Sequence, residues 1–170
     1  MDILHFLKSH HDAITAACSQ LETTTCSNQR RLEFAALTQR LEAYMTLEQD
    51  YLYPEIAGLF PGADNLVAIG AANAAIIDRH LKSLAKLWSK SGEEQPDFAP
   101  HLAELHAVLV KHFEQEEQIL MPKMRTLMRT EDREDLGQVF ADAEADGLAA
   151  LLFKAKDKVK TAAVGSRKRA

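Results

Sequence analysis

Histidine, glutamate and tyrosine side chains interrupt the apolar stripes of this sequence at spacings that suit a buried metal site. Helical periodicity places each on a face that should be buried, and the set comprises His11, Tyr44, Glu48, His80, His112 and Glu116. Burying an unpaired carboxylate is costly, so two carboxylates and three imidazoles at one depth need a shared compensation. A metal ion supplies it, because imidazole nitrogen and carboxylate oxygen are common metal ligands.

An internal repeat supports this interpretation. Residues 44–54 align with residues 112–122 at an offset of 68. Each segment begins with a pair four residues apart, and therefore on one helix face: Tyr44 and Glu48, then His112 and Glu116. His11 aligns with His80 at an offset of 69, which selects His80 over Asn73 on the same stripe. Two helical hairpins would then present equivalent ligands.

Four helices must position these side chains. Apolar stripes with helical spacing run through residues 4–21, 34–51, 73–87 and 102–119. Turn-forming residues separate them at 23–28, 58–65 and 91–100. Because connections this short favour antiparallel neighbours, we predict an all-α protein, an up-down-up-down four-helix bundle. With a rise of about 1.5 Å per residue, the helices would bring all six side chains to nearly one level.

The pattern changes after the fourth helix. We predict that residues 1–125 form the bundle and that residues 126–163 add one or two C-terminal helices on its outside. Thr130 is a candidate helix cap because acidic residues follow it. A shorter helix is predicted over residues 148–159, and a disordered basic tail over residues 164–170.

Composition excludes other classes of protein. Ala and Leu supply 48 of the 170 residues, against 13 for Val and Ile and 12 for Gly and Pro, which favours helices over a β-sandwich or barrel. The sequence has no run of 18 apolar residues, no signal-peptide pattern and only two cysteines, so we expect a cytoplasmic protein without a membrane partner or disulfide framework. A net charge of −5 gives no reason to expect nucleic acid as a partner.

Three motifs resemble those of the hemerythrin-like family, the HHE cation-binding four-helix bundles. They are Leu7-Lys8-Ser9-His10-His11-Asp12-Ala13-Ile14, Leu52-Tyr53-Pro54 and His112-Phe113-Glu114-Gln115-Glu116-Glu117. The resemblance covers about residues 1–125. It implies a non-haem di-iron centre with an oxo or hydroxo bridge, in which Glu48 and Glu116 bridge the irons, His80 and His112 bind one iron and His11 binds the other. Manganese or zinc would also suit these ligands.

The sequence departs from the family pattern at position 44, where Tyr stands in place of His. Tyr44 would either bind a ferric ion as phenolate, hydrogen-bond to Glu48 or a bound water, or mark a site that is partly lost. The neighbours of His80 at a spacing of four are Ile76 and Leu84, whereas the family's oxygen carriers have two histidines there. The resemblance therefore favours binding or sensing of dioxygen, nitric oxide or peroxide, or iron handling, over reversible oxygen carriage.

Two further interpretations come from other classes of function. Apart from Tyr44, the sequence offers no dedicated proton donor, so binding is favoured over catalysis, and peroxide or redox activity is the enzymatic alternative. A bundle that has lost part of its metal site and serves as a protein-interaction or regulatory module is the other. Of the remaining polar residues, Glu114 and Glu117 are interpreted as solvated and Tyr53 as a core residue.

Overall fold

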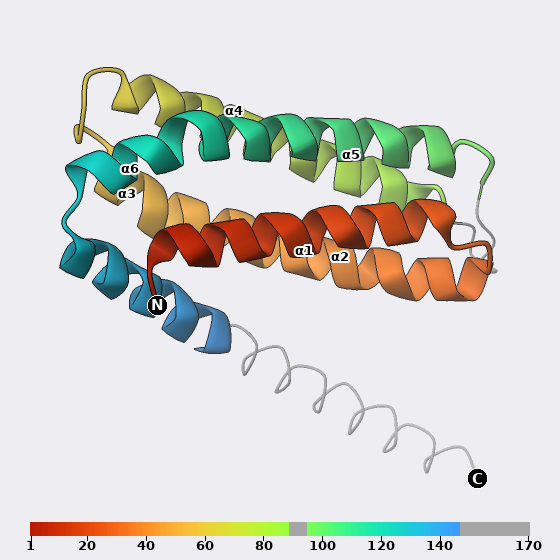
Figure 1. Ribbon diagram of the computed structural model, residues 1–170. Helices are drawn as coiled ribbons and strands as arrows, with labels where there is room; N and C mark the ends of the chain where they lie inside the picture. The colour runs from red at the N-terminus through yellow and green to blue at the C-terminus, as the bar shows by residue number, and fades with distance from the viewer. Residues whose placement is uncertain (89–94, 147–170) are drawn as a thin grey trace, which may run out of the picture.

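The computed structural model describes residues 1–88 and 95–146, and these ranges form helices without a β-strand (Figure 1). The helical elements are α1 (Ile3–Thr23), α2 (Ser27–Leu47), η1 (Glu48–Leu52), α3 (Tyr53–Ile56), α4 (Ala63–Lys86), α5 (Phe98–Gln115), η2 (Glu116–Leu120) and α6 (Met121–Leu127). Another helix follows over residues 130–146. The prediction of an all-α bundle is confirmed.

The four long helices form a closed ring around one core. Helix α1 contacts α2 and α5, α4 contacts α5, and α2 contacts α4. Each helix runs antiparallel to the next along the chain, as Figure 1 shows. The apolar stripes predicted from spacing face inward, with Ile14, Leu41, Ile77 and Leu109 fully buried. The polar residues of the stripes consequently lie inside the bundle rather than on its surface.

Local sequence sets the ends of these helices. The Asp2 carboxylate accepts a hydrogen bond from the backbone N–H of Leu4 at 2.8 Å and caps α1. Gly62 has a positive φ of 90° directly before α4, a conformation that glycine adopts at little cost. The turn at Gly62 helps to keep the connection before α4 short.

Both halves of the internal repeat contain a π-helical turn at the same place. The turns η1 and η2 begin at Glu48 and Glu116, so they are separated by the same offset as the repeat. In each, a backbone N–H five residues on, that of Tyr53 or Met121, bonds to the glutamate carbonyl. Isolated π turns are uncommon and often occur at functional sites, so their pairing marks this level of the bundle.

The helix over residues 130–146 lies against the outside of α1. Arg133 Nε lies 3.0 Å from the Asp2 carboxylate, and the Phe140 ring contacts Phe6 and Tyr51 edge-on. The predictions for residues 148–159 and 164–170 fall outside the described residues. Among those that the structure describes, no helix is long and apolar enough to cross a membrane.

Candidate metal centre

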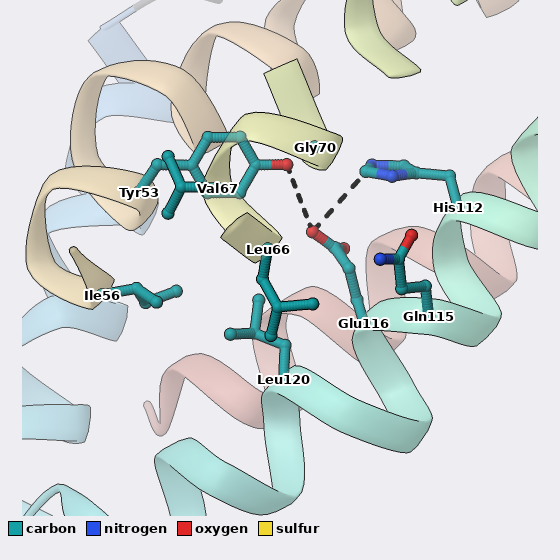
Figure 2. Close-up of a pocket in the computed structure, with 9 residues that line it drawn as sticks. All are labelled: Tyr53, Ile56, Leu66, Val67, Gly70, His112, Gln115, Glu116 and Leu120. Atoms are coloured by element: carbon teal, nitrogen blue, oxygen red, sulfur yellow. Dashed lines mark hydrogen bonds and ion pairs between the residues drawn. The ribbon is translucent and has the colours of Figure 1, made fainter. Parts of the chain in front are cut away.

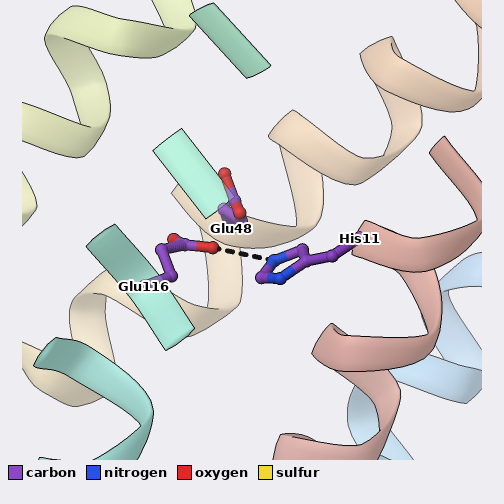
Figure 3. Close-up of side chains that lie close together, drawn as sticks. All are labelled: His11, Glu48 and Glu116. Carbon is purple, nitrogen blue, oxygen red and sulfur yellow. Dashed lines mark hydrogen bonds and ion pairs between the residues drawn. The ribbon is translucent and has the colours of Figure 1, made fainter. Parts of the chain in front are cut away.

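Three side chains from three helices converge in the core at the level of the π turns. One ligand atom from each of His11, Glu48 and Glu116 lies within 4.8 Å of the other two (Figure 3). His11 Nε2 is 3.0 Å from Glu116 Oε2. All three are buried, with exposed fractions of 1%, 0% and 4%. A nitrogen and two carboxylates facing one another in this way can hold a metal ion.

His112 completes the other side of this cluster. Its Nε2 lies 3.3 Å from Glu48 Oε2 and 3.9 Å from Glu116 Oε1. The two carboxylates therefore lie between the two imidazoles, with His11 on one side and His112 on the other. This order is the one that two carboxylates bridging a pair of metal ions would need.

Tyr44 lies inside the cluster rather than beside it. Its hydroxyl is 2.7 Å from His11 Nε2 and 3.3 Å from Glu116 Oε2. Burial, together with the negative charges of Glu116 and Glu48, holds the pKa of Tyr44 well above its usual value. The phenol is therefore neutral in the metal-free protein and would need a cation to ionise.

The charged forms of the two carboxylates are unfavourable when no cation accompanies them. Burial raises the pKa of Glu48 to about 7, and burial and the charge of Glu48 raise the pKa of Glu116. Burial opposes charge on His11, but hydrogen bonds from its ring to Glu116 and Glu117 prevail and raise its pKa. Positive charge is therefore favoured where His11 faces Glu116, and a cation would be stabilised in the same place.

A further observation supports the fit between these side chains and a metal ion. Glu48 Oε1 is fully buried and has no hydrogen-bond partner among the described residues. Such an atom is costly unless something binds it. Two imidazole nitrogens, two carboxylates and a phenol are ligands that iron accepts, so the residues present are chemically compatible with the centre that the sequence predicts.

The structure does not bring His80 to this cluster. The α4 side chain that reaches it is Asn73, whose Nδ2 lies 3.4 Å from Nδ1 of His112. His80 is seven residues farther along α4, about 10 Å away along the helix axis, and is partly exposed. Because residues seven apart share one stripe, periodicity could not choose between them. The axial position of α4 against α5 determines which of the two residues reaches His112.

Glu117, expected to be solvated, belongs to the surroundings of the centre. Its Oε1 accepts a hydrogen bond from Nδ1 of His11 at 2.8 Å, and Lys8 Nζ lies 3.2 Å from its Oε2. Histidine ligands commonly donate their second N–H to a carboxylate in this way, which fixes the ring orientation. The sequence signal for this role was the pair of consecutive glutamates that ends the motif of residues 112–117.

Tyr53, expected to be a simple core residue, also reaches the carboxylates. Its hydroxyl lies 3.4 Å from Glu48 Oε2 and 3.4 Å from Glu116 Oε1. In a regular α-helix a residue five positions after Glu48 would face about 140° away. The π turn adds one residue to this turn and brings Tyr53 back beneath Glu48. Helical periodicity therefore missed it.

Comparison with known proteins agrees with this geometry. The Hemerythrin HHE cation binding domain family matches residues 2–124. No curated protein and no solved structure matches the chain. The match spans both halves of the repeat and every residue of the buried cluster, and the two together indicate a metal-binding domain. The chain belongs to the hemerythrin HHE cation-binding domain family.

Proposed function

We propose that this protein holds a non-haem di-iron centre and binds or senses a small ligand, namely dioxygen, nitric oxide or peroxide, or handles iron. The observation that carries the proposal is the buried group of His11, Glu48 and Glu116, whose ligand atoms face one another within 4.8 Å. The unpartnered Glu48 Oε1 supports it, because a buried carboxylate oxygen without a partner is stabilised by a cation.

Each residue of the cluster has a distinct role in this proposal. Glu48 and Glu116 would hold both ions between them, His11 and Tyr44 would serve one side, and His112 the other. Bound iron would supply redox chemistry and coordination positions open to a small ligand. Manganese and zinc suit the same donors, and zinc would bring no redox chemistry.

The chain's own residues prepare the site. Glu117 holds His11 so that Nε2 faces the carboxylates, and Asn73 contacts His112 on the ring atom remote from Glu48. The buried Phe113 ring stacks on His11 with 4.2 Å between the ring centroids and limits access of water on that side. A low local dielectric strengthens the attraction between the carboxylates and a cation.

Metal analysis together with an optical spectrum tests the proposal. Protein produced with iron should contain up to two metal ions per chain and absorb visible light after aerobic isolation. Less than about one iron per chain would contradict it. Hydrogen peroxide turnover that is lost in His112→Ala would add an enzymatic activity, and its absence would leave binding or sensing as the function.

A second candidate follows from Tyr44 and Asn73. Tyr44 stands where the family has a histidine, and the α4 side chain that reaches His112 is Asn73 rather than a histidine. A bundle with fewer nitrogen donors that no longer retains metal would serve as a protein-interaction or regulatory module. In that case Glu48→Gln with Glu116→Gln stabilises the isolated protein, because two uncompensated carboxylates leave the core. If the isolated protein carries metal, the same change destabilises it.

A further inference from the structure

A small cavity adjoins the candidate metal centre on the side of α3, α4 and η2 (Figure 2). Its volume is about 20 Å³, which is room for about one water-sized molecule. Ile56, Leu66, Val67 and Leu120 supply its apolar walls, and Glu116 and His112 supply a polar wall. A molecule inside the cavity would therefore be small and would touch two members of the buried cluster.

The Tyr53 phenol also lines this cavity. Its hydroxyl is 3.4 Å from each of the two carboxylates, Glu48 and Glu116, at the long end of hydrogen-bond distances. One O–H serves one acceptor well at a time, so it can turn to a third acceptor. The phenol carries one O–H that it can donate to such an acceptor.

Gly70 of α4 leaves the space that the Tyr53 phenol occupies. A Cβ atom at this position would overlap the Tyr53 hydroxyl and lie 2.5 Å from Cζ of the ring. Glycine inside a helix costs roughly 1 kcal/mol against alanine, and Gly70 lies well inside α4. Its bare backbone lets the phenol lie flat against α4, with the hydroxyl directed toward Glu116 (Figure 2).

Tyr53 also lines a second space beside this cavity. This second space is a wider groove of about 630 Å³ along the small side chains Ala71, Ala74 and Ala75 of α4. Tyr53 and Val67 line both spaces. A ligand that enters from the groove would pass these two side chains before it meets Glu116.

We propose that Tyr53, seated on Gly70, forms the selective wall of a binding cavity for one neutral diatomic molecule and donates a hydrogen bond to it. The small volume of the cavity excludes larger ligands, and the neighbouring carboxylates favour a neutral molecule over an anion. Dioxygen and nitric oxide share this chemistry. The inference rests on the proposed function for its purpose, but the cavity itself exists without a metal.

The first test uses the metal-free 170-residue chain and dissolved dioxygen as a paramagnetic probe in NMR. Methyl protons of Ile56 and Leu120 should relax faster than those of Leu37 and Leu105, which are buried to a similar extent but do not line the cavity. Gly70→Ala should reduce the enhancement to the control level. Equal enhancement in both groups, or no effect of Gly70→Ala, would overturn the proposal.

The second test measures nitric oxide release from the iron(II)-loaded protein by optical spectroscopy. Tyr53→Phe keeps the ring and removes one hydrogen-bond donor, so release should be about tenfold faster. Tyr51→Phe is the matched control, because Tyr51 is 37% exposed and lies outside the cavity. Equal rates in the two variants would overturn the role of Tyr53.

Measuring the metal content distinguishes failure of the proposed function from failure of the cavity proposal. If the wild-type protein holds no iron, the proposed function fails, and the dioxygen experiment still decides whether the cavity exists. If iron is bound and the cavity methyl groups show no enhancement, the cavity proposal alone fails.

Discussion

Nδ1 of His11 lies 2.8 Å from Oε1 of Glu117, so the ring donates to a carboxylate on one side and presents Nε2 to Glu116 on the other. This arrangement fixes the tautomer that a metal ligand needs, with its lone pair toward the ion. The contact joins α1 to η2 and makes the position of His11 depend on the fourth helix. Glu117 is therefore a positioning residue for the candidate centre.

Glu117→Gln should lower metal affinity by about 10- to 100-fold, because the amide is a weaker acceptor and no longer compensates positive charge on His11. Competition with a chelator measures this affinity. Glu114→Gln is the matched control, since Glu114 is exposed on α5. Equal affinities for the two variants would show that the hydrogen bond to His11 does not support metal binding.

Tyr44→Phe should remove a visible absorption band from the ferric iron-loaded protein. The Tyr44 hydroxyl is 2.7 Å from His11 Nε2, so it is placed to bind the same ion as His11. A bound phenolate transfers charge to ferric iron and colours it, whereas phenylalanine cannot. Tyr53→Phe serves as the control and should keep the band. An unchanged spectrum in Tyr44→Phe would mean that the phenol only donates hydrogen bonds.

Glu48→Gln should stabilise the metal-free protein above neutral pH. Because the pKa of Glu48 is raised to about 7, the folded protein keeps this proton while the unfolded chain loses it near pH ~4.3. The free energy of unfolding therefore falls as pH rises from ~4.3 to about 7, and then levels off. The variant lacks this decline, so at pH 8 its free energy of unfolding should exceed that of the wild type by roughly 3–4 kcal/mol.

Urea unfolding across this pH range, with a chelator present, measures the effect of Glu48→Gln. Glu42→Gln on the exposed side of α2 is the control and should follow the wild-type profile. Parallel profiles for the wild type and Glu48→Gln would show that the folded protein does not hold the Glu48 proton.

The sequence predicts that His80 is the metal ligand of its helix, whereas in the structure it is Asn73 that reaches the cluster. Because Asn73 contacts His112 and His80 does not join the cluster, Asn73→Ala should weaken metal binding about tenfold, whereas His80→Ala should leave it unchanged. Loss of metal in His80→Ala would restore the assignment made from the repeat.

Much of the site is local in sequence and was predictable for that reason. Residues four apart share a helix face whatever the surroundings, so Tyr44 with Glu48 and His112 with Glu116 could be recognised as pairs. The cost of burying carboxylates then required them to face one another across the bundle. The repeat offset of 68 is matched by the two π turns, which begin at these same glutamates.

The sequence by itself thus determined the helices, their inward faces and the two carboxylate-bearing motifs, because all three depend on spacing along one helix. The tertiary structure decided the rest. The axial position of α4 against α5 placed Asn73 and not His80 beside His112, and the π turn after Glu48 brought Tyr53 beneath the carboxylates. Neither is encoded in periodicity, because a stripe repeats every seven residues and a single widened turn changes which side chains share a face.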